Sequence, residues 1–170
     1  ELSDFSGAGM GFPGPVLPDG HCEVCVNLGW KAGNPQQELS RLLDGMPVKS
    51  GNDANVAALG EMWQGGGKGY SDLVMVTLGT GVGGGIIIDG KIFAGFNYAG
   101  AELGHMVIRA GGEECTCGRR GCFEAYASAT ALIRETKRAM AAHPESRMHA
   151  AAEENGAVDG RTAFIAAQRG

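Results

Sequence analysis

The fold class is decided by one stretch of the sequence, Leu73-Val-Met-Val-Thr-Leu-Gly-Thr-Gly-Val-Gly-Gly-Gly-Ile-Ile-Ile88. Its first six residues are apolar and partly β-branched, which predicts a short buried strand over 73–78. Ile86–Ile88 predicts a second strand, and Asp89-Gly90 is a hairpin signal that returns the chain through Lys91–Phe93. Together with helical patterns on both sides, these strands indicate an α/β protein.

Further elements are predicted on both sides of this stretch. Strands are predicted over 4–11, where the chain runs into a Gly/Pro turn, at about 23–28, and up to a strand end near Val48. Helices are predicted over 35–44, over 53–64, where Gly65-Gly-Gly67 stops the helix, and over 123–142 as one long element. The polar stretch 143–160 predicts a loop with some helical character.

Composition narrows the classes of partner. The chain has 170 residues and a formal net charge of -5, which argues against a nucleic acid or an anionic membrane as the main partner. No apolar run approaches the roughly 20 residues that cross a bilayer. The cysteine count is odd, at five, and three of the five lie in one short loop, so a reducing cytoplasm is expected.

Both ends of the sequence predict a piece of a longer polypeptide. A strand pattern begins near Asp4 without a preceding element to pair with, and 161–170 reads as a helix that has barely started. Such a piece would expose sheet edges and apolar faces, which predicts a homo-oligomer.

The densest chemical signal is a loop of thiols with one imidazole upstream. Cys115, Cys117 and Cys122 lie within eight residues, interleaved with glycine, and His105 stands ten residues before the first. A Cys3His set suits tetrahedral zinc, whereas three unrelated thiols are the alternative. Glu102 and Glu124 bracket the loop. They would either orient the zinc ligands or accept hydrogen bonds from sugar hydroxyls, and the spacing does not separate these roles.

Cys22 and Cys25 form a second Cys-x-x-Cys spacing. No second thiol pair and no suitably spaced histidine completes a metal site around them. We therefore interpret both as ordinary structural residues.

The glycine-rich segment from Thr77 to Gly85 joins the two predicted strands. Glycines let backbone N–H groups point at an oxyanion, and Thr80 adds a hydroxyl donor. The segment lacks the ending of a P-loop and does not open a helix as a dinucleotide fingerprint does. Phosphate binding and a plain glycine-rich bend both remain open from spacing alone.

Asn52-Asp53 stands directly before the helix predicted over 53–64. Asparagine and aspartate are favoured helix caps, and capping is the commoner use of such a pair. The alternative is a general base, held by the positive end of the helix dipole, that accepts the proton of an attacking hydroxyl.

Six motifs in this order resemble one family. They are Gly9-Met-Gly-Phe-Pro-Gly-Pro-Val16, Asn27-Leu-Gly-Trp30, Asn52-Asp-Ala-Asn-Val-Ala-Ala-Leu-Gly-Glu61, Leu78-Gly-Thr-Gly-Val-Gly-Gly-Gly85, Ala101-Glu-Leu-Gly-His105 and Cys115-Thr-Cys-Gly-Arg-Arg-Gly-Cys-Phe-Glu124. Together they resemble the ROK family of bacterial sugar kinases and repressors, and most closely its ATP-dependent glucokinases.

The resemblance implies an actin-like, RNase H-like sugar kinase fold, with 1–48 ending the small lobe and 49–170 in the large lobe. It implies phosphoryl transfer from ATP, with magnesium, to the 6-hydroxyl of glucose. Asp53 is then the catalytic base. Sugar hydroxyls would be bound by Asn52, Glu102, His105 and Glu124, with Gly14 and Asn27 lining the same pocket. Thr80 and Gly81 would contact the phosphates, and a structural zinc would be held by His105, Cys115, Cys117 and Cys122.

Two departures limit what the resemblance implies for this length of chain. The Asp-x-Gly-Gly-Thr phosphate loop with which family members begin does not occur here, and the glycine-rich segment that closes around adenosine is missing. The chain by itself is therefore expected to be inactive. A sugar-responsive ROK repressor, or a kinase for fructose, N-acetylmannosamine or N-acetylglucosamine, is the alternative to a glucokinase.

Overall fold

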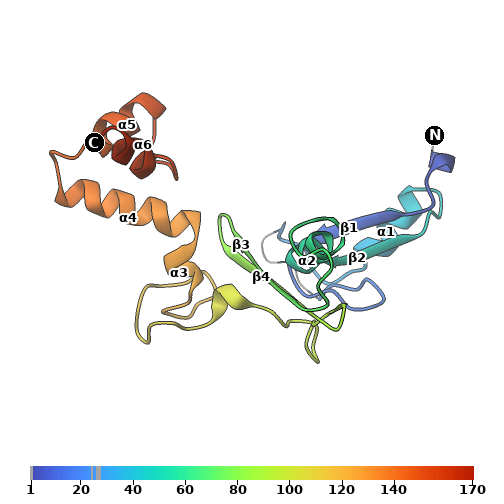
Figure 1. Cartoon of the computed structure of the whole chain (residues 1–170). Coiled ribbons are helices and arrows are strands. Elements are labelled where there is room, and N and C mark those ends of the chain that lie inside the picture. The colour runs from blue at the N-terminus through green and yellow to red at the C-terminus, as the bar shows by residue number, and fades with distance from the viewer. Residues whose placement is uncertain (1, 24, 26–27) are drawn as a thin grey trace. The chain divides into compact units, whose positions relative to one another are not determined.

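The computed structural model describes residues 2–23, 25 and 28–170, and these form two compact units (Figure 1). The first unit contains the chain up to Val76 together with Gly83–Glu102. The second unit contains Thr77–Val82 and Leu103–Gly170.

A two-stranded parallel sheet lies at the centre of the first unit. Strands β1 (Ala8–Phe12) and β2 (Val48–Asn52) pair from Ala8 opposite Val48 to Phe12 opposite Asn52. The connection between them carries helix α1 (Pro35–Leu42), as a parallel crossover requires. The strand predicted over 4–11 is displaced, because Leu2–Asp4 forms the short 3-10 helix η1 and pairing begins only at Ala8.

Helix α2 (Asp53–Gln64) has the predicted bounds. The Asn52 side chain accepts a hydrogen bond from the backbone N–H of Asn55 and caps the helix, and the chain leaves helical geometry at Gly65. The buried face of α2 consists of Ala54, Asn55 and Ala58.

Strands β3 (Leu73–Leu78), β4 (Val82–Ile88) and β5 (Lys91–Ile92) form a second sheet in that order, with β4 and β5 antiparallel. The prediction of a buried β3 is wrong, because Val74, Val76 and Leu78 are exposed on one face and the residues between them are only half-buried. The glycine segment is also largely strand. Pairing resumes at Val82, so only Gly79–Gly81 connects β3 to β4.

The strand predicted at about 23–28 is not found among its described residues. Cys22 and Cys25 make isolated bridges to Gly33 and Trp30, and residues 24, 26 and 27 lie outside the described part. Both cysteines are buried in a small cluster with Phe12, and the Cys25 thiol donates to the carbonyl of Pro13. This placement agrees with the interpretation of Cys22 and Cys25 as structural residues.

In the second unit, η3 (Leu103–His105) is followed by the loop that carries Cys115, Cys117 and Cys122, which we call the cysteine loop (residues 106–123), and then by four helices. These are α3 (Glu124–Ala127), α4 (Ala129–Ala142), α5 (Met148–Asn155) and α6 (Thr162–Gln168). The prediction of one helix over 123–142 is wrong. Ser128 is extended (φ -78°, ψ 162°) and caps α4 by accepting from the N–H of Ala131, so it separates α3 from α4.

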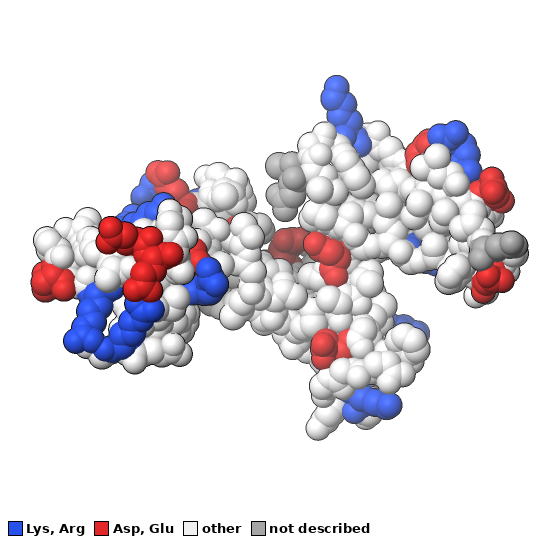
Figure 2. Space-filling view, turned by 90° about the horizontal axis from the view of Figure 1, so that it is seen from above, with Lys and Arg blue, Asp and Glu red and all other residues white. Residues whose placement is uncertain are grey.

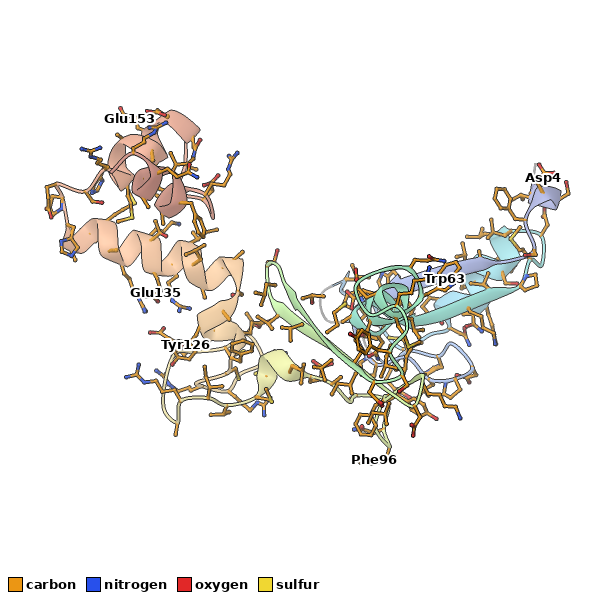
Figure 3. All side chains as sticks on the ribbon, in the orientation of Figure 1. Asp4, Trp63, Phe96, Tyr126, Glu135 and Glu153 are labelled. Carbon is orange, nitrogen blue, oxygen red and sulfur yellow. The ribbon has the colours of Figure 1, made fainter. Side chains whose placement is uncertain are left out.

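Charged side chains of both signs are interspersed on the face drawn in Figure 2, without a continuous basic surface. Several large apolar side chains are exposed, among them Trp63 and Phe96, which are labelled in Figure 3. Among the helices formed by the described residues, none combines the length and the apolar character that a membrane crossing needs.

Candidate functional site

The four predicted zinc ligands converge in the second unit. One donor atom from each of His105, Cys115, Cys117 and Cys122 lies within 4.8 Å of the others. The Sγ atoms of Cys117 and Cys122 are 3.7 Å apart, and Sγ of Cys115 is 3.6 Å from Nδ1 of His105. Tetrahedral zinc bonds of about 2.3 Å to sulfur and about 2.0 Å to nitrogen require separations of about 3.8 Å and about 3.5 Å. The donor set and its spacing therefore fit zinc.

The loop reaches this geometry through two glycine turns and two short bridges. Gly118 and Gly121 both have φ of 83°, in the left-handed region that side chains other than glycine rarely adopt. Val107 pairs with Cys122, and Glu114 pairs with Arg120. These contacts fold the chain back so that its thiols face one point.

His105 presents its two ring nitrogens differently. Nδ1 lies against the Cys115 sulfur and is therefore the nitrogen placed to bind a metal together with the thiols, which leaves Nε2 for another partner. The ring is carried by η3, which packs closely against β4: a Cβ on Gly104 would overlap the carbonyl of Val82.

The thiols of Cys117 and Cys122 have pKa values shifted in opposite directions. The backbone N–H and then the guanidinium of Arg119 stabilise the thiolate of Cys117 and lower its pKa to about 6. Burial, followed by hydrogen bonding to its neighbours, raises the pKa of Cys122 to about 11. Arg119 also donates from Nη2 to the His105 carbonyl at 3.0 Å, so one side chain contacts two ligand-bearing residues.

Replacing Arg119 by glutamine is expected to weaken zinc binding by roughly tenfold, because partners of metal ligands typically contribute tenfold or more to affinity. Arg120→Gln is the matched control. Its guanidinium bonds the Gly112 carbonyl and Glu114 and touches no ligand, yet the variant loses the same charge. Competition with a chromophoric chelator measures both affinities, and equal losses in the two variants would contradict the role of Arg119.

The cysteine loop is anchored to α3 and α4 through Glu113. Its carboxylate accepts two hydrogen bonds from Arg138, at 2.7 and 3.1 Å, and these lower the pKa of Glu113. Its backbone N–H donates to the hydroxyl of Tyr126, which Figure 3 labels beside the loop. Arg134 in turn donates to the Ala125 carbonyl. The loop is therefore held to the helices at its base.

Glu124 connects the cysteine loop to the β3–β4 connection. Its Oε2 accepts from the N–H of Val82 at 2.9 Å, and its Oε1 accepts from the Thr116 hydroxyl at 3.3 Å. Gly81 allows this approach, because a Cβ there would overlap the carboxylate. The sequence analysis expected Glu124 either to orient the zinc ligands or to bind sugar hydroxyls. It missed the contact of Glu124 with the β3–β4 connection.

Thr80 and Gly81, which the sequence analysis expects to contact phosphates, lie in the β3–β4 connection (Gly79–Gly81), which we call the phosphate turn. The start of α4 contacts it twice. Ala129 donates its N–H to the Gly79 carbonyl, and the Thr130 hydroxyl donates to the Thr80 carbonyl, both at 2.8 Å. Nothing in the sequence spacing indicates these contacts, since the acceptors are backbone carbonyls.

Other predicted residues lie in the first unit. Asn52 donates from Nδ2 to the Gly14 carbonyl at 3.3 Å, which brings two predicted sugar contacts together. Asp53 is exposed at the first position of α2, where Oδ1 accepts from the Ala54 N–H at 2.8 Å. Glu102 is exposed at the last residue of this unit. Asn27 lies outside the described residues.

Residues 1–168 match the ROK family. The chain belongs to the ROK family. It is 41% identical to a glucokinase of Halalkalibacterium halodurans over 97% of the chain and 50% of that protein. It is 37% identical to a xylose repressor of Caldicellulosiruptor bescii over 83% of the chain and 35% of the repressor.

Among solved structures, the chain is similar to a ROK glucokinase of Streptomyces griseus in complex with glucose and AMPPNP. The TM-score is 0.84 at 35% identity, over 98% of this chain and 55% of that one. The expected fold class, the α/β, actin-like fold of ROK sugar kinases, is confirmed over this length of chain. The chain spans about half the length of these glucokinases.

Proposed function

We propose that the protein containing this chain transfers the γ-phosphoryl group of ATP, with magnesium, to the 6-hydroxyl of glucose. The observation that carries this proposal is Asp53, an exposed carboxylate fixed at the start of α2 beside the capping residue Asn52. A pure sugar-binding protein has no need of a positioned base, whereas transfer to an alcohol does. The 41% identity to a glucokinase supports the same activity.

In this proposal Asp53 accepts the proton of the attacking hydroxyl. Sugar hydroxyls are bound by Asn52, Glu102, His105 and Glu124, with Gly14 and Asn27 beside them. Thr80 and Gly81 bind the phosphates. The transferred group carries negative charge, which backbone donors would stabilise, and magnesium would supply further positive charge there when bound.

Zinc has a structural role in the proposal. His105, Cys115, Cys117 and Cys122 would fill all four positions, so no position stays open for a reacting water. The metal would fix the tautomer of His105 and leave its Nε2 to hydrogen-bond a sugar hydroxyl.

Two features of the wider protein belong to the same proposal. Residues 1–48 end a small lobe and 49–170 form much of a large lobe. The protein acts in the cytoplasm as a homo-oligomer. Size-exclusion chromatography with light scattering tests the oligomer directly.

The second candidate is a sugar-responsive repressor, which the similarity to a xylose repressor favours. A coupled assay of the full-length protein separates the two, with glucose, mannose, fructose and the two N-acetylated hexosamines as acceptors and ATP or polyphosphate as donor. We expect turnover with glucose and ATP. Absence of turnover with every pair, together with specific DNA binding, would replace the kinase by the repressor.

A further inference from the structure

Thr130 has a hydroxyl that its own helix does not use. Ser128 already caps α4 by accepting a hydrogen bond from the N–H of Ala131, so the Thr130 hydroxyl is not needed as the cap. Thr130 is exposed and directs its hydroxyl to the Thr80 carbonyl, 50 residues earlier in the sequence. Thr136, on the same helix, shows the ordinary alternative: its hydroxyl bonds the Leu132 carbonyl one turn back.

The contacts of α4 fix the direction of two successive peptide groups. The carbonyls of Gly79 and Thr80 both point to the start of α4, where Ala129 and Thr130 donate to them. In a trans peptide the carbonyl and the following N–H point in opposite directions. The N–H groups of Thr80 and Gly81 therefore both point away from α4.

Successive N–H groups directed to one side form a concave site for an anion. Val82 is excluded from such a site. Its N–H is bound by Oε2 of Glu124, and a carboxylate beside that N–H repels a phosphate. The phosphate turn thus offers an anion two N–H groups, those of Thr80 and Gly81, on the side opposite α4.

We propose that Thr130 is a positioning residue for the phosphoryl donor, because its hydroxyl holds the peptide of Thr80 with the Gly81 N–H facing the phosphates. This inference rests on the proposed function for the identity of the anion, a nucleoside triphosphate. Thr130 itself does not touch the nucleotide. Loss of the Thr130 hydroxyl lets the peptide group between Thr80 and Gly81 rotate. Part of the binding free energy of the nucleotide is then used to order the phosphate turn.

The test compares Thr130→Val, Thr130→Ser and the control Thr136→Val in the full-length protein. Calorimetry measures the dissociation constant for AMPPNP, and steady-state kinetics measures KM for ATP and for the hexose. Thr130→Val is expected to raise the AMPPNP dissociation constant and the ATP KM about threefold to tenfold, the value of one hydrogen bond. Thr130→Ser and Thr136→Val should each differ from the parent by less than about twofold.

The hexose KM separates positioning from general loosening. It should stay within about twofold in Thr130→Val, because the altered peptide faces the phosphates. Equal rises in both KM values, an unchanged AMPPNP affinity, or the same effect in Thr136→Val would overturn the inference. A parent protein that binds no nucleotide would overturn it too.

Nucleotide binding needs no turnover, so the inference and the proposed function fail separately. If the parent binds AMPPNP but phosphorylates no hexose, the proposed function is wrong, and the weaker binding of Thr130→Val still decides the role of Thr130. If turnover occurs and Thr130→Val resembles the parent, the proposed function stands and the inference falls.

Discussion

Replacing Asp53 by asparagine in the full-length protein is expected to lower kcat for hexose phosphorylation by about 10²- to 10⁴-fold, the usual contribution of a general base. Asparagine has the same shape and can still accept the hydrogen bond that Asp53 takes from the Ala54 N–H. It cannot take the proton of the attacking hydroxyl. The hexose dissociation constant should therefore change by no more than about threefold, since the amide retains the polar contacts of the site.

Folding should survive this substitution. Loss of a negative charge at the start of α2 costs about 0.3–1 kcal/mol, which is small beside the stability of a domain. The control is Asp72→Asn, because Asp72 is another exposed carboxylate whose Oδ1 accepts a backbone N–H, that of Asp89. Single-turnover rates measured with saturating ATP and hexose should fall only in Asp53→Asn. Near-parental turnover in that variant would rule out Asp53 as the base.

Elements with local signals were predictable from the sequence. The bounds of α2 follow from Asn52 at its start and Gly65 at its end, and those of β3 from an apolar run that begins after Asp72 and ends before Gly79. The cysteine part of the Cys3His cluster was predictable for the same reason, since three thiols and two glycine turns lie within eight residues, with His105 only ten residues upstream. In each case the deciding residues are neighbours along the chain.

Features set by distant packing were not predictable. Whether one face of β3 is covered depends on what packs against the sheet, and no pattern within Leu73–Leu78 carries that information. The break at Ser128 had a signal, a serine cap three residues before Ala131, but the helical periodicity on both sides outweighed it.

The same limit applies to the site. Arg119 and Thr130 each donate to a backbone carbonyl, that of His105 and that of Thr80, and a carbonyl is present at every position of any sequence. Only the folded chain shows which carbonyl a side chain reaches. Residue type suggests candidates for ligands and bases, because the chemistry demands those types, but it does not point to the residues that would orient them.

Removal of the metal is the second change for which we expect a large effect, because zinc would order the cysteine loop. Most side chains of the loop between His105 and Cys122 are exposed, and among the described residues only Cys115, Gly121 and Cys122 of this loop are buried. So little apolar burial cannot order some 15 residues against about 1–2 kcal/mol of backbone entropy each. Zinc supplies about 10–16 kcal/mol in small structural sites, which offsets much of the roughly 15–30 kcal/mol that ordering those residues costs.

Cys117→Ser is therefore expected to release zinc and to raise the hexose KM by at least about tenfold, with a smaller change in kcat and in the ATP KM. Cys117 is the right position because its side chain is exposed, so the substitution leaves the buried thiols and their packing intact. Metal content measured by plasma emission, together with kinetics at several hexose concentrations, gives the result.

Chelated parent protein should behave in the same way and should recover with zinc but not with magnesium, which prefers oxygen ligands. A zinc-free preparation with an unchanged hexose KM would show that the metal does not shape sugar binding through His105. A loss of kcat alone would instead assign the metal to phosphoryl transfer, against the closed four-ligand shell that its donors form.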